Sequence, residues 1–93
     1  MANISVDTLE RENAYEVHVT VREGRERTRH TVTLAKADYE RISRGAASPA
    51  DLVVESFRFL LEREPKESIL RSFDLTVITR YFPEYEREIK KRL

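Results

Sequence analysis

Residues 14–22 read AYEVHVTVR, and this stretch decides the fold that the sequence predicts. Apolar and polar side chains alternate along it. Tyr15, Val17, Val19 and Val21 fall on one side, and Glu16, His18, Thr20 and Arg22 fall on the other. A period of two residues is typical of a β-strand that buries one face and exposes the other.

A second alternating stretch, Thr28 to Leu34, follows a short segment with a turn-forming glycine, Glu23–Gly24–Arg25–Glu26. The two stretches predict an antiparallel hairpin. Upstream, Ile4 and Val6 alternate in the same way. The N-terminal sheet therefore has two strands, or three if residues 3–9 join it.

After the hairpin, the apolar residues take up helical spacing. Lys36–Arg44 predicts a first helix, with Gly45 placed for a left-handed C-terminal cap. The second helix ends at Pro65, and its N-terminus carries an N-cap candidate, a proline at the first position and an acidic variant of the capping box: Ser48, Pro49 and Asp51.

Three further segments are predicted as short helices: Pro65–Phe73 with Leu70 facing inward, Asp74–Tyr81 with Asp74 as its N-cap, and Glu84–Arg92 after Pro83. The predicted architecture is α+β: an N-terminal antiparallel β-hairpin, or three strands, followed by four or five short α-helices. A chain of 93 residues supports one domain, which spans residues 1–93.

Composition argues against several functions. The 17 basic and 17 acidic residues cancel, so long-range attraction to nucleic acid or to an anionic membrane should be weak. The chain has no cysteine, which excludes disulfides and thiolate metal sites. No apolar run approaches the roughly 20 residues of a membrane-spanning helix, and no signal-peptide pattern is present, so we expect a soluble cytoplasmic protein.

Catalytic signatures are missing from the sequence. Two glycines leave no phosphate-cradling loop, and no nucleophile or zinc-hydrolase motif occurs. His18 and His30 fall on opposite faces of the predicted hairpin, where half-exposed sheet residues are the simpler interpretation. Most carboxylates alternate with arginine or lysine at helical spacing, as on a solvated helix face. We therefore expect no enzymatic activity, no metal and no cofactor.

Nucleic-acid binding is the alternative function. Four arginines, Arg22, Arg25, Arg27 and Arg29, gather at the hairpin tip, although Glu23 and Glu26 interrupt them. Residues 66–82 outline a helix-turn-helix, with Arg80 able to contact a phosphate or a base edge. That motif needs a small residue where Leu70 stands, and Pro83 shortens its second helix, so the alternative is not favoured.

The leading function follows from the C-terminal half. Seven large apolar residues crowd thirteen positions, more than one short helix can bury: Phe73, Leu75, Val77, Ile78, Tyr81, Phe82 and Tyr85. We assign Phe73, Ile78 and Tyr81 to the core. We assign Phe82, Tyr85 and Phe59, which lies off the apolar stripe of its helix, to a partner contact. This predicts a non-enzymatic interaction module that binds itself as a homodimer, or another protein, through this surface or through an open strand edge.

The segment ESFRFLLEREPKESILRSFDLTVITRYFPEYEREI, Glu55 to Ile89, resembles a group of short uncharacterised bacterial proteins. In that group a hairpin precedes the same helix and the same Phe-Pro-Glu-Tyr ending. The resemblance covers the second half of the chain closely and the hairpin loosely. It implies a complete small protein, and it transfers no activity, ligand or site residue.

Overall fold

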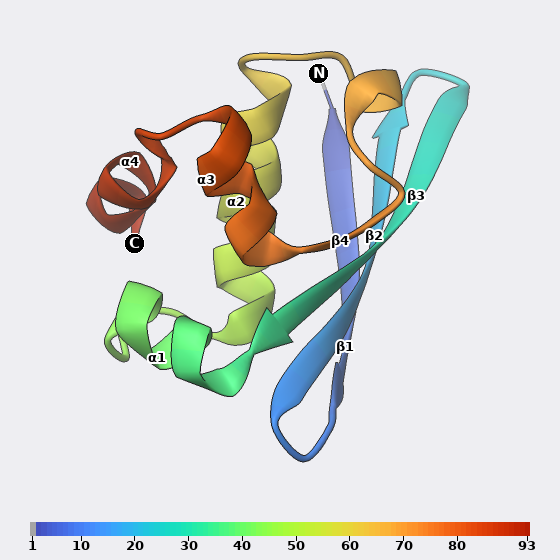
Figure 1. Cartoon of the computed structure of the whole chain (residues 1–93). Helices are drawn as coiled ribbons and strands as arrows, with labels where there is room; N and C mark the ends of the chain where they lie inside the picture. Colours follow the sequence, from blue (N-terminus) through green and yellow to red (C-terminus); the bar gives the residue numbers. More distant parts are fainter. Residues whose placement is uncertain (1) are drawn as a thin grey trace.

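The alternating stretch forms one strand of a long hairpin, β2 (Ala14–Glu23) and β3 (Glu26–Ala35), in the computed structural model, which describes residues 2–93 (Figure 1). The turn holds Gly24 and Arg25 between the paired residues Glu23 and Glu26. Gly24 takes a φ of +61° at the first of these two positions, where most side chains would be strained. The predicted hairpin is confirmed.

Two further strands extend the hairpin into a sheet with the order β1-β2-β3-β4. β1 (Asn3–Glu10) runs antiparallel to β2, so the third strand forms. β4 (Ser72–Asp74) runs parallel to β3. This last strand contradicts the predicted helix over Pro65–Phe73, of which only a 3-10 turn at Lys66–Ser68 exists.

Sheet pairing explains why β4 replaces the predicted helix. The backbone N–H of Thr31 donates to the carbonyl of Arg71 at 2.7 Å, and Phe73 lies opposite Val32 on the apolar side of the sheet. These tertiary contacts outweigh the weak helical spacing of the segment. The helix-turn-helix outline is therefore wrong, because its first helix is absent.

Four α-helices form in residues 2–93, and all four lie on one side of the sheet (Figure 1). They are α1 (Lys36–Ser43), α2 (Pro49–Leu61), α3 (Ile78–Tyr81) and α4 (Tyr85–Arg92). Both predicted N-caps are confirmed: Ser48 Oγ accepts from the N–H of Asp51 at 3.1 Å, and the Asp74 carboxylate accepts from the N–H of Thr76 at 3.0 Å. Within this part of the chain, no helix is long and apolar enough to cross a membrane.

The hydrophobic core lies between the sheet and the helices. The alternating residues of β2 and β3 enter it from one side, and α2 and α4 enter it from the other. Its largest buried members are Phe57, Phe59, Leu34, Ile42, Leu52, Leu75, Tyr85 and Ile89. The opposite face of the sheet is polar and open to solvent, as the alternation predicts.

Candidate functional site

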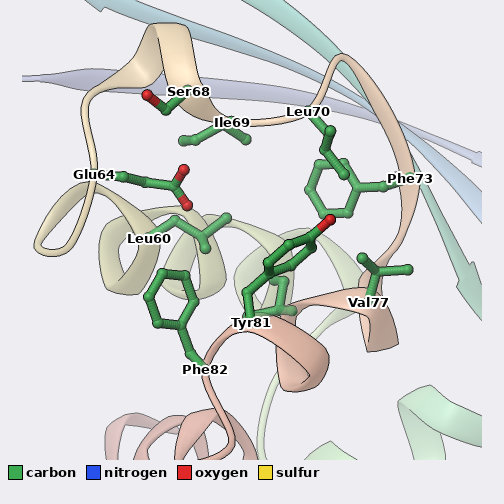
Figure 2. Close-up of a pocket in the computed structure, with 10 residues that line it drawn as sticks. Leu60, Glu64, Ser68, Ile69, Leu70, Phe73, Val77, Tyr81 and Phe82 are labelled. Carbon is green, nitrogen blue, oxygen red and sulfur yellow. The ribbon is translucent and has the colours of Figure 1, made fainter.

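An apolar groove of about 230 Å³ opens between the end of α2 and the segment that runs through β4 into α3 (Figure 2). Its polar lining residues are Glu64 and Ser68. The apolar ones are Leu60, Ile69, Leu70, Phe73, Val77, Ile78, Tyr81 and Phe82. An apolar cavity of about 150 Å³ can admit a benzene-sized molecule. The groove therefore has room for one aromatic or branched side chain.

The chain forms this groove because it leaves α2 and returns to it. The 3-10 turn at Lys66–Ser68 and the short strand β4 carry the backbone to the sheet edge, and the cap at Asp74 starts the helical turns that bring it back. Leu60, Ile69 and Ile78 are the buried lining residues of the groove, each at most 5% exposed. One wall of the groove is therefore connected to the sheet through β4, and the other wall is formed by the end of α2.

The rim of the groove exposes two large apolar side chains. Tyr81 is 64% exposed and Leu70 is 47% exposed. In the described residues only Leu9, at 44%, is a comparable exposed apolar group, and it lies on the other face of the sheet. Figure 2 shows the Tyr81 ring extending from α3 toward Phe73 and Leu70. Apolar exposure on the helical side is therefore concentrated at this rim.

Glu64 is the charged group of the groove, and Figure 2 shows its carboxyl directed into it. Its carboxylate makes no ion pair with any residue in the range 2–93. Burial raises the pKa of Glu64, because the charged form loses part of its hydration. A cation brought to this position would restore the lost stabilisation of the carboxylate.

The predicted partner-contact residues are placed differently from one another. Phe82 is half-buried and lines the groove, which agrees with a surface role. Phe59 and Tyr85 are both 0% exposed, so their assignment to a partner contact is wrong. Tyr81, assigned to the core, is the most exposed large hydrophobic residue within positions 2–93, so that assignment is also wrong.

Aromatic packing between α2 and α4 explains the burial of Phe59 and Tyr85. Their ring centroids lie 5.3 Å apart in an edge-to-face arrangement, and the Arg63 guanidinium covers Phe59 at 3.6 Å from its centroid. The Tyr85 hydroxyl lies 2.6 Å from Ser56 Oγ, and burial raises the pKa of this phenol. The spacing of Tyr85 and Ile89 along α4 is the sequence signal for this burial.

The core assignments of Ile78 and Phe73 agree with the structure. Ile78 is 2% exposed and belongs to the core, as expected. Phe73 packs against the core from the sheet edge, with its ring centroid 6.1 Å from that of Phe57. Leu70, predicted to face inward, lies on the rim because its segment is not helical.

The structure separates the arginines of the nucleic-acid alternative. Arg22, Arg27 and Arg29 project from the open face of the sheet, and Arg25 lies in the hairpin turn. Arg80 lies on α3, within the helical layer on the other side of the sheet. The five residues therefore do not form one surface.

The two histidines also occupy different environments. His18 is exposed and lies 2.7 Å from a Glu16 carboxylate oxygen. His30 is buried at 3% exposure, contrary to the expected half-exposed position. Its Nδ1 donates to the Leu70 carbonyl at 2.7 Å, and in the neutral ring its Nε2 accepts from the Thr28 hydroxyl at 2.8 Å. A neutral imidazole satisfies both contacts, and burial lowers the pKa of His30.

Residues 2–93 contain no group of three or more His, Asp or Glu side chains placed to hold a metal ion. Comparison of the chain with protein-family models, with curated proteins and with solved structures gives no match. A functional assignment must therefore come from the groove and from the charged surfaces of the molecule.

Proposed function

We propose that this chain is a non-enzymatic protein-interaction module that associates with a second copy of itself through the apolar groove. The observation that carries the proposal is the pairing of a groove that can accept an apolar side chain with two exposed apolar side chains, Leu70 and Tyr81, on its own rim. A surface that has both parts is self-complementary, as an interface between two identical subunits must be.

Charge supports a second copy as the occupant. Glu64 lies in the groove without an ion-pair partner, and Arg80, exposed beside Tyr81, also has none within residues 2–93. We propose that a two-fold axis places Tyr81 in the partner groove and pairs Arg80 of one copy with Glu64 of the other. Each dimer would then contain two such pairs.

The size of the apolar rim indicates a weak dimer. A tyrosine side chain can bury about 150–250 Å², so covering the exposed 64% of Tyr81 removes roughly 130 Å² from water. At about 25 cal/mol/Å² this contributes about 3 kcal/mol for each copy. Association costs about 4–15 kcal/mol in lost translational and rotational freedom. We therefore expect a dimer that forms reversibly at high concentration.

Sedimentation velocity from about 10 µM to 1 mM tests the proposal. We expect the wild-type protein to dimerise, and Tyr81→Ser and Leu70→Ser to shift the equilibrium toward monomer. Leu9→Ser is the matched control, because Leu9 and Leu70 are exposed to similar extents, 44% and 47%. Circular dichroism of each variant would confirm that the fold is kept.

A charge exchange tests the geometry of the dimer. Glu64→Arg and Arg80→Glu should each weaken association, and the double variant should recover it, because the pair is then restored with reversed signs. A wild-type chain that stays monomeric at 1 mM would contradict self-association. So would a dimer that Leu9→Ser weakens as much as Leu70→Ser does.

A further inference from the structure

The hairpin tip carries an arginine cluster on the open face of the sheet. Arg22 lies directly opposite Arg27, and Arg29 is the diagonal neighbour of Arg22 on the same side. Directly opposed residues in antiparallel strands have Cβ atoms about 4.5–5.5 Å apart, and diagonal ones lie about 7–8 Å apart. All three side chains are exposed. We call these three residues the arginine face.

No carboxylate of residues 2–93 forms an ion pair with the arginine face. The two nearest acidic residues in sequence, Glu23 and Glu26, project to the opposite side, where Lys66 Nζ lies 3.3 Å from one and 3.9 Å from the other. Like charges placed directly opposite each other in a sheet are destabilising. The cluster therefore lacks the counter-charge that a purely structural role would provide.

We propose that the arginine face binds the phosphate backbone of a nucleic-acid duplex. The planar guanidinium group matches phosphate oxygens with two parallel hydrogen bonds. The hydroxyl of Thr20, which lies directly opposite Arg29, projects from the same face and can donate to phosphate oxygens as well.

The other residues of the open face favour a duplex over a single strand as the ligand. In β1, β2 and β3, the open-face residues include no Phe, Tyr or Trp. Proteins that bind single strands rely on such rings to stack bases, whereas a backbone contact to a duplex needs only cations and hydroxyls. The other end of this face carries Asp7 and Glu16, so the contact is confined to the hairpin tip.

Fluorescence anisotropy with a labelled 20-base-pair duplex, titrated between about 25 and 200 mM KCl, tests the proposal. Each phosphate contact contributes about −0.9 to the slope of log K against log salt for B-form DNA. The triple variant Arg22→Gln, Arg27→Gln, Arg29→Gln should make that slope less negative by about 2.7, the sum of three such contacts.

The control triple variant is Arg44→Gln, Arg87→Gln, Lys90→Gln. These residues are exposed and make no ion pair within residues 2–93, and they lie outside the strands. The control should keep the wild-type slope. The arginine-face variant should also unfold at the same temperature as wild type or higher, because the substitutions relieve repulsion between like charges.

Four outcomes would overturn the proposal. The wild-type protein could fail to bind the duplex at the lowest salt, or the control variant could lose as much of the slope as the arginine-face variant. Tighter binding to a single strand of the same length would contradict the duplex. Poly-glutamate could also displace the labelled duplex as effectively as an unlabelled duplex of equal charge does. That result would indicate an acidic protein as the partner.

Discussion

The buried hydrogen bond between Ser56 and Tyr85 allows a sharp test of how α4 packs against α2. Ser56 Oγ donates to the Leu52 carbonyl at 2.7 Å. A serine hydroxyl has one proton, so the Tyr85 hydroxyl must be the donor in the 2.6 Å contact between the two side chains. Both residues are 0% exposed, so water cannot replace either partner.

This assignment of the proton makes the two single substitutions unequal. Tyr85→Phe removes the donor but leaves Ser56 bonded to Leu52, so it should cost about 0.5–1.5 kcal/mol, the net value of one hydrogen bond. Ser56→Ala leaves the Tyr85 hydroxyl buried without an acceptor, which should cost about 1–3 kcal/mol. In the double variant that hydroxyl is absent, so Ser56→Ala should be close to neutral when residue 85 is phenylalanine.

Urea unfolding followed by circular dichroism measures all four proteins of this double-mutant cycle. An unchanged m value would show that each difference in midpoint reports stability. The interaction energy between the two positions should equal the cost of Ser56→Ala beside Tyr85, about 1–3 kcal/mol. Costs that add to within about 0.5 kcal/mol, or a Tyr85→Phe variant as stable as wild type, would refute the buried contact. A Tyr85→Phe variant as stable as wild type would indicate that the Tyr85 hydroxyl is exposed to water.

Two further predictions concern buried ionisable groups. Because burial lowers the pKa of His30 below its ordinary value of about 6.5, the unfolded chain binds a proton that the folded chain resists, and stability should fall as pH decreases below about 6.5. Between pH 7.5 and pH 5.5 the unfolding temperature of His30→Gln should decrease less than that of the wild type. An equal decrease in both proteins would contradict a buried, neutral His30. His18→Gln is the exposed control. Lys66→Met should lower the unfolding temperature at pH 7 more than the exposed control Lys90→Met, because Glu23, Glu26 and Glu67 lose a shared cation. That loss should shrink at high salt, and a loss independent of salt would indicate packing rather than charge.

Local signals in the sequence were enough for most of the fold. The alternation over residues 14–22 fixes both the hairpin and its register, because a shift by one residue would turn every valine toward solvent. Side-chain caps are equally local, so Ser48 and Asp74 mark the beginnings of their helical segments correctly.

The segment between Pro65 and Asp74 was mispredicted because its conformation depends on distant residues. Its helical spacing rests on three apolar residues, and the competing strand gains its hydrogen bonds from β3, about 40 positions away in sequence. No pattern within the segment itself reports that pairing. The exposed position of Leu70 follows from the same cause.

The candidate site was only partly predictable. The crowding of apolar residues after Phe73 correctly indicated more apolar surface than α3 can bury, and Phe82 and Tyr81 both line the resulting groove. Which residue faces outward could not be read from a helix of four residues, because one turn does not establish a periodic face. In α4, which is twice as long, the spacing of Tyr85 and Ile89 does establish one.

The arginine face shows why charge order along a chain is a poor guide to charge in space. In sequence order Glu23 and Glu26 alternate with the neighbouring arginines, and the whole chain has a formal net charge of zero. In a strand, however, adjacent residues project to opposite faces, so the register places Arg22 with Arg27 and Glu23 with Glu26. The field at a bound phosphate is set by charges within about 10 Å, the Debye length at 0.1 M salt. A neutral chain can therefore present a cationic surface on one face of its sheet while the groove on the other side remains free to associate with a second copy.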